Sequence, residues 1–358
     1  MTRFFPPKTL AGRIALAVAL MAGIFALFWW RGPSFRALGD AFTSVVWEWV
    51  VLAIAINLLS VVVRALCWST VIHQAMPPPH PKSQTVFSAF SVGLFANAVL
   101  PGRIGELARV AVLNRKMPRR KGLWATLVGT VLAHRVFDIV PVMLLILYVI
   151  VTAKVPAWAI TILLAIVGIG IGLFTFSVVS ARTHTRHGPR LDGTTGAARR
   201  VFEMARYGLG VMRSPFWMAV AISFQIAGWV CQLFAVWVAM RAFHVHAPLP
   251  AAGVVLLVMN VVTIFPFWPG NVGAVQLAIA APLSASYGVD YAHGVAYGFG
   301  LQAIEASVGI GVGLIFLARE GLSVAMLKVM PSAAQTQLPN EPAEEDDSAE
   351  PTRARVPG

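Results

Sequence analysis

Six apolar stretches, each long enough to cross a membrane, constrain this chain more than any other feature. A helix needs about 20 mostly apolar residues to cross the hydrocarbon core of a bilayer. The six stretches are Arg13 to Trp30, Val46 to Leu66, Gly122 to Thr152, Ala157 to Ser180, Phe216 to Phe243 and His293 to Ala318. Only 12% of the 358 residues are charged, whereas a soluble domain has about a quarter. The sequence therefore predicts an all-α polytopic integral membrane protein.

The formal charge of +13 is concentrated in short connections between these stretches. One basic block runs from Arg115 to Lys121 and another from Arg182 to Arg213. By the positive-inside rule both blocks are cytoplasmic, and attraction to anionic lipid accounts for the excess of charge. We therefore expect a multi-pass protein of the bacterial inner membrane with both termini in the cytoplasm, and no nucleic-acid partner.

The end of the chain differs in composition from the rest. Residues 331–358 are polar, rich in proline and acidic, and contain too little apolar surface to order themselves. We expect a disordered cytoplasmic tail there, and a transmembrane domain over residues 1–330. The first apolar stretch is followed by Trp29-Trp30-Arg31 rather than by a small-residue cleavage site, so we expect it to be a retained anchor.

Two segments that are not simple spans contain the same Pro-Gly break. Ser83 to Asn114 contains PGRIG, with Pro101, Gly102 and Gly105. Ala251 to Tyr287 contains PGNVG, with Pro269, Gly270 and Gly273. Pro and Gly together interrupt a helix, so each segment is predicted to be a broken helical hairpin.

Polar residues within the neighbouring helices recur at nearly the same offsets from each break. Asn57 and Gln225 each lie 44 residues before the proline of their break, and Arg64 and Gln232 each lie 37 before it. Downstream, each copy has a polar pair at i, i+3 on one helix face: Arg135 with Asp138, and Gln302 with Glu305. This pattern predicts an internal duplication, offset by 168 residues, with repeats at about 46–152 and 216–319.

Counting spans from a cytoplasmic N-terminus decides how the two copies are related. If six stretches cross the membrane and the two broken hairpins are re-entrant, every basic block falls on the cytoplasmic side. The first hairpin then dips in from the cytoplasm and the second from outside, so the copies are inverted repeats, as in many transporters. A rival count, in which each hairpin is a pair of short spans, stays open.

Ionisable and polar groups at membrane depth are costly and call for partners or a function. Arg103 lies in the first break, where the N-terminus of the next half-helix favours a phosphate or a carboxylate. The candidate substrate-binding residues are Asn97, Arg103, Glu106, Arg109, Arg135 and Asp138 in the first copy, and Asn271, Gln276, Gln302 and Glu305 in the second. We find no catalytic motif and expect neither a metal nor another cofactor.

Simpler interpretations compete with a binding site. The pair of Arg135 with Asp138, or of Arg103 with Glu106, would also arise from ion pairs that merely join helices. The position of Arg64, four residues before Trp68, is equally typical of an arginine whose side chain extends toward the membrane surface. Glu305 has no cationic neighbour in sequence, so it is either protonated or paired across helices.

Three of these motifs together resemble a known family. Asn97-x-x-x-Pro101-Gly102-Arg103-x-Gly105-Glu106-x-x-Arg109, His134-Arg135-x-x-Asp138 and Pro266-x-x-Pro269-Gly270-x-x-Gly273 resemble the flippase-like transmembrane domain of lysylphosphatidylglycerol synthases and of their stand-alone relatives. The resemblance covers roughly Arg13 to Ala318, and it implies a domain that moves a phospholipid or similar amphiphile between leaflets.

The chain also departs from that family. Gln276 stands where the family often has Glu, and His134 where it often has an acidic residue. The family's synthase activity belongs to a soluble C-terminal domain, whereas fewer than 40 residues follow Arg319, so we expect no synthesis of lysylphosphatidylglycerol.

The leading hypothesis is a flippase or transporter in which Arg103, Arg109 and Arg135 hold an anionic lipid headgroup. In it Glu106, Asp138 and Glu305 balance charge or accept a proton. Two alternatives are an integral-membrane enzyme that acts on lipid-linked substrates, and a non-transporting partner of a lipid-modifying or glycan-assembly enzyme. Homo-oligomerisation stays open.

Overall fold

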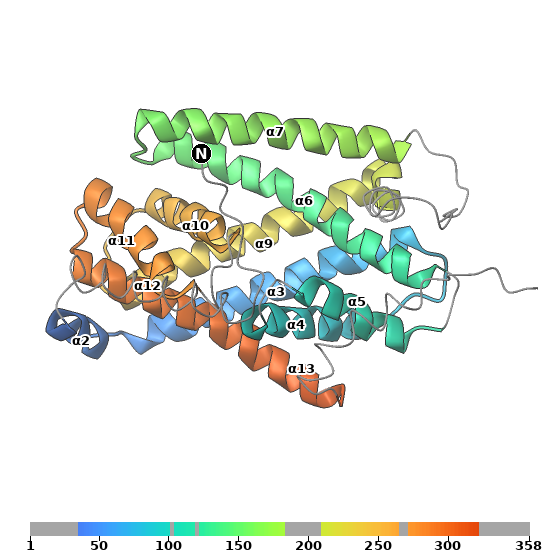
Figure 1. The fold of residues 1–358 in the computed structure, drawn as a ribbon, viewed down its shortest axis with the longest axis horizontal. Coiled ribbons are helices and arrows are strands. Elements are labelled where there is room, and N and C mark those ends of the chain that lie inside the picture. Colours follow the sequence, from blue (N-terminus) through green and yellow to red (C-terminus); the bar gives the residue numbers. More distant parts are fainter. Residues whose placement is uncertain (1–34, 101–103, 119–121, 183–208, 265–270, 322–358) are drawn as a thin grey trace, which may run out of the picture.

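The computed structural model describes residues 35–100, 104–118, 122–182, 209–264 and 271–321, and all regular elements in these ranges are helices (Figure 1). Five of the helices are long and apolar enough to cross a membrane. The predicted class, an all-α polytopic membrane protein, is therefore confirmed. The first predicted span, Arg13 to Trp30, and the predicted tail at 331–358 lie outside the described residues.

The helices follow the apolar stretches closely. In chain order they are α2 (Phe35–Thr43), α3 (Trp47–Ala75), α4 (Ser83–Val99), α5 (Gly105–Lys116), α6 (Leu123–Thr152), α7 (Ala157–Arg182), η1 (Leu209–Arg213), α9 (Pro215–Ala242), α10 (Leu249–Ile264), α11 (Ala274–Tyr287), α12 (Tyr291–Ala306), η3 (Ser307–Val312) and α13 (Gly313–Arg319). The last three form one continuous span, in which η3 is a π-helical turn.

Equivalent helices of the two copies begin close to 168 residues apart. The first copy consists of α3 to α6, and the second of α9 to α13. The long first helices, α3 and α9, lie side by side and cross at the centre of the molecule (Figure 1). At the crossing, the Ser60 hydroxyl donates to the Gly228 carbonyl at 2.9 Å, and these two residues are themselves 168 apart.

Further contacts show the direction of the two crossing helices. The amide of Val46 donates to the Ala242 carbonyl at 3.0 Å, and the Cys67 thiol donates to the Ala221 carbonyl at 3.3 Å. Residue numbers rise along α3 as they fall along α9, so the helices are antiparallel. Because equivalent helices run in opposite directions and a residue contacts its own counterpart, a local two-fold axis passes near Ser60 and relates two inverted repeats.

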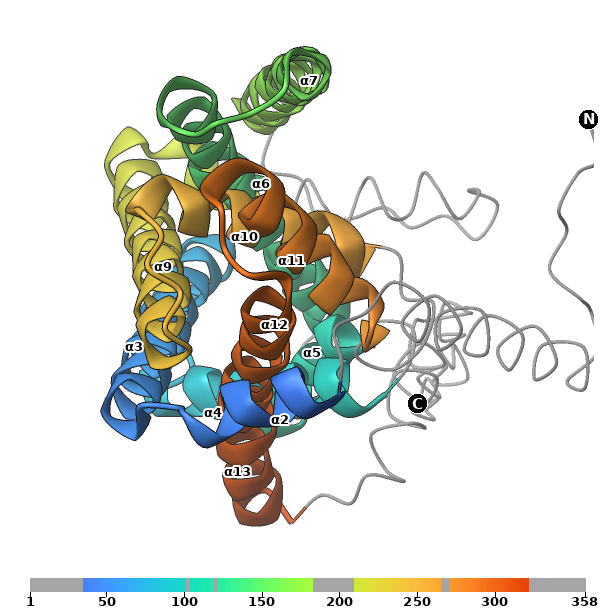
Figure 2. The ribbon, with the colours of Figure 1, turned by 90° about the vertical axis from the view of Figure 1, so that its left-hand side faces the viewer.

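Each broken segment folds into a pair of short helices. In the first hairpin α4 packs against α5, and the Asn97 side-chain oxygen accepts from the Gly105 amide at 2.9 Å. In the second hairpin α10 is followed by α11, which packs closely on α12 (Figure 2). With 12 and 14 residues, α5 and α11 are shorter than the roughly 20 residues that a span requires.

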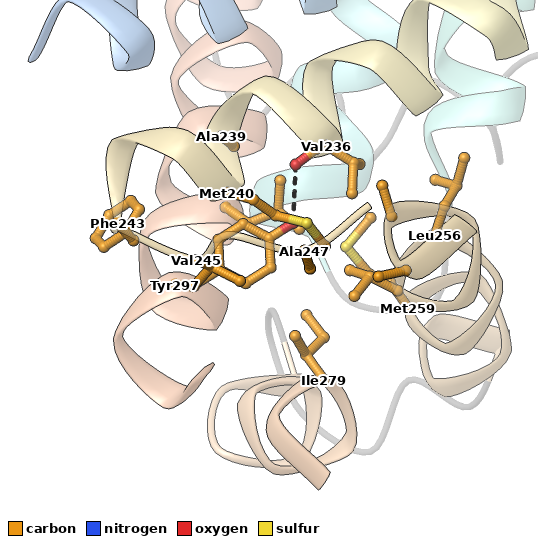
Figure 3. Packing of buried hydrophobic residues seen from close by; sticks show 14 of the residues in the cluster. Val236, Ala239, Met240, Phe243, Val245, Ala247, Leu256, Met259, Ile279 and Tyr297 are labelled. Carbon is orange, nitrogen blue, oxygen red and sulfur yellow. Dashed lines mark hydrogen bonds between the residues drawn. The ribbon is translucent and has the colours of Figure 1, made fainter. Parts of the chain in front are cut away.

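An apolar cluster joins the second hairpin to the end of α9. Met240, Leu256 and Ile279 are almost fully buried in it, and the Tyr297 hydroxyl donates to the Val236 carbonyl at 2.9 Å (Figure 3). That bond satisfies the polar atom that Tyr297 brings into the core. The cluster therefore fixes α9, α10, α11 and α12 to one another.

Candidate functional site

A chain of ion pairs links the start of α5 to the middle of α6. Glu106 pairs with Arg109 three residues further along α5, and its other carboxylate oxygen pairs with Arg135 of α6. Arg135 also donates to the Asp138 carboxylate at 3.1 Å. Two arginines and two carboxylates thus compensate one another at the first break, and most of their charge is already paired within the protein.

Arg109 is the buried member of this chain. Its guanidinium carbon lies 4.7 Å from the centre of the Trp68 ring and 5.3 Å from that of Phe90. The residue is only 3% exposed, so the electron-rich ring faces and Glu106 replace the water that an exposed arginine would have. Arg109 therefore serves chiefly to anchor α5 against α3 and α4.

Asp138 receives further hydrogen bonds from the second repeat. One of its carboxylate oxygens accepts from the Gln225 amide, and from the Trp229 indole N–H at 2.9 Å. Both donors come from α9, one turn apart. With Arg135 on the other oxygen, Asp138 has donors enough to hold a negative charge inside the bilayer region.

A cavity of about 250 Å³ lies between the two repeats, next to the crossing of α3 and α9. Asn57, Ser60 and Arg64 line it from one face of α3, at the i, i+3, i+7 spacing of a helix. Gln232 of α9 and Glu305 of α12 line it from the second repeat. Arg64 and Gln232 are equivalent residues of the two copies, so the cavity straddles the local two-fold axis.

Arg64 contributes an unpaired positive charge to this cavity. Its guanidinium carbon lies 5.1 Å from the centre of the Trp229 ring. Within the described ranges, no hydrogen bond or ion pair of its guanidinium is found, and its Nε is buried without a partner. A Cβ at Gly228 would lie 2.8 Å from the Arg64 side chain, so the glycine of the crossing makes room for it. The cavity therefore offers a preformed anion-binding group.

Glu305 faces the same cavity at a break in its own helix. The Gln232 amide donates to its carboxylate at 2.8 Å, and the Ser60 hydroxyl contacts the Gln232 oxygen at 3.3 Å. The π-helical turn η3 begins two residues further on, and its Val308 and Gly309 also line the cavity. Single π-helical turns often occur at functional sites. Glu305, for which the sequence offered no cationic neighbour, thus hydrogen-bonds across helices.

The amides of the second break hold the hairpin together. The Gln276 oxygen accepts from the Gly273 amide at 2.6 Å, and its nitrogen donates to Gln302 at 2.6 Å. Asn271 donates to the Val262 carbonyl at 3.0 Å. Gln276 and Asn271 are both buried. These polar atoms are therefore used structurally, and among the described residues of the second hairpin no cation replaces the ion pairs of the first.

The structure thus divides the predicted site residues into three groups. Glu106, Arg109, Arg135 and Asp138 come together in the ion-pair chain, whereas Asn97, Asn271, Gln276 and Gln302 hold the hairpins and their neighbouring helix. Glu305 alone lines the central cavity. Arg103, and with it Pro101, Gly102, Pro269 and Gly270, lies outside the described residues.

Arg64 is the functional candidate that sequence reasoning underrated. It lies near the middle of α3, and its guanidinium stacks over Trp229 of α9. Its offset of 37 residues before Pro101, shared by Gln232 before Pro269, was the available signal. That offset marks two equivalent positions, and the antiparallel crossing brings both to one cavity.

Comparison with known proteins identifies the family. The model of the family described as the lysylphosphatidylglycerol synthase TM region matches residues 14–313, which is most of the 358-residue chain. No curated protein and no solved structure matches the chain. The match includes both hairpins, the ion-pair chain and the central cavity, and the chain belongs to the lysylphosphatidylglycerol synthase TM region family.

Proposed function

We propose that this protein is a lipid flippase or transporter of the inner membrane, which moves an anionic phospholipid or a similar lipid-linked amphiphile between leaflets. The observation that carries the proposal is the guanidinium of Arg64 in a cavity between two inverted repeats. Among the described residues it has no hydrogen-bond or ion-pair partner. Membership of a lipid-related membrane family supports a lipid as the substrate.

The chemistry of the cavity favours an anionic headgroup. An arginine presents several N–H donors in a planar fork that matches the oxygens of a phosphate. Asn57, Ser60 and Asn260 add neutral polar groups around it. At about 250 Å³ the cavity suits a headgroup, while the acyl chains stay in the surrounding lipid.

The architecture favours movement of the headgroup rather than static binding. In transporters built from inverted repeats, the substrate site lies near the midplane at the interface of the repeats, and rocking of the repeats exposes it to each side in turn. Here Arg64 belongs to the first repeat, whereas Gln232 and Glu305 belong to the second. A movement of one repeat against the other would therefore open the cavity.

The test is a flipping assay with the full chain in vesicles of phosphatidylcholine that contain fluorescent phosphatidylglycerol. Dithionite then bleaches the outer leaflet and reports the rate of exchange. We expect Arg64→Ala to slow exchange by about tenfold or more, because hydrogen bonds to a charged group are worth about 1.5–3 kcal/mol. Arg64→Lys, which keeps the charge but not the planar fork, should retain part of the rate.

Arg241 provides a matched control on α9. Its guanidinium carbon lies 5.0 Å from the centre of the Trp237 ring, so it too stacks on a tryptophan, but it does not line the cavity. Arg241→Ala should exchange lipid at the wild-type rate. If Arg64→Ala does so as well, the cavity is not the path of the headgroup.

A second pair of variants tests the first break. Arg135 is 53% exposed at its side chain even though it pairs with Glu106 and Asp138. If Arg103→Ala and Arg135→Ala both move lipid at the wild-type rate, neither arginine holds the headgroup. Transport would then depend on Arg64 rather than on the break.

A further inference from the structure

Two carboxylates lie near Arg64: Asp138 is linked to it through Trp229, and Glu305 lines the same cavity, but they are supported very differently. Asp138 is held by Arg135, Gln225 and Trp229, and the Trp229 ring that carries its indole donor also lies against Arg64. Glu305 has one hydrogen bond within the described ranges, from the neutral amide of Gln232. Asp138 can therefore keep its charge without Arg64, whereas Glu305 cannot do so as easily.

Among the described residues that line the cavity of Glu305, one carries a positive charge. Besides Glu305, the polar side chains that line the cavity are those of Asn57, Ser60 and Arg64 from α3, Gln232 from α9, and Asn260 and Thr263 from α10. Arg64 alone among them is ionisable. On its own helix, Tyr297 lies about two turns away, and its hydroxyl donates to the Val236 carbonyl. The charge of Glu305 thus depends on a cation that it must share with any anion in the cavity.

Binding of a phosphate to Arg64 removes this compensation. An anionic headgroup brings a second negative charge into a cavity where Arg64 and Glu305 together are neutral. An uncompensated charge in a low-dielectric site is strongly unfavourable, and a carboxylate in this position takes up a proton instead. A protonated Glu305 still accepts from Gln232 and gains an O–H that can donate to a phosphate oxygen.

We propose that the cavity binds an anionic headgroup together with one proton, which Glu305 carries, so that each transported phosphodiester crosses the membrane as a neutral complex. This inference rests on the proposed function and adds to it the coupling of lipid movement to a proton. No covalent bond changes: the proton comes from the water on one side and leaves to the water on the other. The headgroup's single negative charge and the proton cancel.

The first measurement is the pH dependence of exchange of fluorescent phosphatidylglycerol in phosphatidylcholine vesicles, with the same pH on both sides. In the wild type the rate should fall as pH rises above the range in which Glu305 is protonated in the complex. The fall should approach about tenfold per pH unit, because the protonated fraction decreases in that proportion. Glu305→Gln, a permanently neutral mimic, should exchange lipid at close to the wild-type acid rate and show no such fall.

A carboxylate outside the cavity serves as the control. Glu48 lies at the exposed start of α3 and does not line the cavity. Glu48→Gln should keep the wild-type pH profile. If Glu305→Gln also keeps that profile, the proton is not carried by Glu305 and the inference is overturned.

The second measurement does not require transport. When the detergent-solubilised protein binds glycerophosphoglycerol at a pH at which ligand-free Glu305 is ionised, calorimetry in buffers of different ionisation enthalpy should report the uptake of about one proton by the wild type, and of none by Glu305→Gln. Binding by the wild type without proton uptake would overturn the inference.

The outcomes also separate this inference from the function on which it rests. If the folded wild type exchanges no lipid at any pH, the flippase proposal fails, whatever calorimetry reports. If the wild type exchanges lipid but prefers zwitterionic phosphatidylethanolamine at a pH-independent rate, flipping stands and proton coupling is wrong. The carboxylate of Glu305 would then bind the ammonium group of the phosphatidylethanolamine headgroup.

Discussion

The two hairpins solve the same structural problem with different chemistry. In each, the helix after the break begins next to an equivalent glycine, Gly105 or Gly273, whose amide is capped by a side-chain oxygen. In the first hairpin the cap comes from Asn97 of the preceding helix, and ion pairs of Glu106 tie the helix to α6. In the second the cap comes from Gln276, which also binds α12 through Gln302. The two hairpins thus share the backbone break but not the interactions that hold it.

The last helices of the two repeats show the same relation. Helix α6 contains Pro141, and its counterpart 168 residues later is Gly309, within the π-helical turn η3. A proline removes a backbone hydrogen bond, and a π-helical turn shifts the pattern of such bonds. The helix of the second copy thus changes its hydrogen-bond pattern at this level, whereas α6 continues through Pro141 as an α-helix, and only the second helix directs a carboxylate, Glu305, into the cavity.

The two hairpins should differ most in how much stability the protein loses when their central side chains are removed. Glu106→Ala leaves buried Arg109 without its ion pair and Arg135 with a single carboxylate. Breaking a buried pair in this way costs about 3–5 kcal/mol, so the unfolding midpoint in mild detergent should fall markedly. Glu106→Ala combined with Arg109→Met should recover part of the loss. If the double variant is no more stable than Glu106→Ala, the buried charge is not the cause.

Gly105 tests whether the first hairpin depends on close backbone contact. A Cβ at this position would collide with the Gly93 carbonyl oxygen and with Asn97. Gly105→Ala should therefore lower stability by about 3 kcal/mol, near the upper end of overpacking effects. Gly168→Ala in α7, where no atom lies within 4 Å of the added methyl, is the control. Equal unfolding midpoints for the two variants would contradict the expected collision.

Gln276→Ala should lower the free energy of unfolding less than Glu106→Ala does, because it removes a neutral group. It leaves the buried Gly273 amide without the oxygen that it contacts at 2.6 Å, and it removes one hydrogen bond of the Gln302 side chain. Unsatisfied buried polar groups cost about 1–3 kcal/mol. The unfolding midpoint should fall accordingly, with phosphatidylglycerol exchange less affected than in Arg64→Ala. A loss of stability that matches or exceeds that of Glu106→Ala would remove the distinction between charged and neutral hairpins.

The smallest expected change in stability comes from an ion pair of the first hairpin that has no equivalent at the matching positions of the second. Lys116 of α5 lies 2.7 Å from Glu320, just after α13, whereas the counterparts of these residues are Ser284 and Thr152. Burial would raise the pKa of the Glu320 carboxyl, but hydrogen bonds from Lys116 and Ser88 and the charges of Lys116 and Arg115 outweigh it, so the pKa lies below its ordinary value.

A lowered pKa gives the sign of the pH effect. The contribution of Glu320 to stability is complete above the ordinary pKa of glutamate and is lost as pH falls through the lowered pKa. Glu320→Gln should therefore lower the free energy of unfolding at neutral pH by less than about 1 kcal/mol, because the side chain of Lys116 is 43% exposed. The difference from the wild type should vanish in acid. A difference that grows in acid would contradict this assignment.

Much of the fold was predictable because its signals are local. The apolar stretches predicted α3, α6, α7, α9 and the span from Tyr291 to Arg319, and the Pro-Gly breaks predicted the short helices between them. The end of α3 was placed too early, at Leu66, because Cys67, Trp68 and the polar residues after them dilute the apolar pattern. These residues pack inside the protein, where Trp68 is fully buried and donates to Thr130 at 3.1 Å.

The candidate site was less predictable because it depends on contacts between distant segments. The spacing of Glu106 and Arg109, and of Arg135 and Asp138, indicated pairs within helices, but not that Glu106 would join the two. The pairing of Arg64 with Trp229 requires the crossing of α3 and α9, which no local pattern predicts. The same holds for the π-helical turn after Glu305, since its residues also suit an ordinary helix.

The contact between Ser60 and its own counterpart, Gly228, has the geometry of a contact in a symmetric dimer. A residue on a two-fold axis touches its own copy in a symmetric homodimer, and the crossing of α3 and α9 has the same geometry within one chain. In such a homodimer the positions of Arg64 and Gln232 would be identical, and two arginines would face the same cavity. In this chain the two positions differ, and the described residues that line the cavity include one cation, Arg64, and one acid, Glu305.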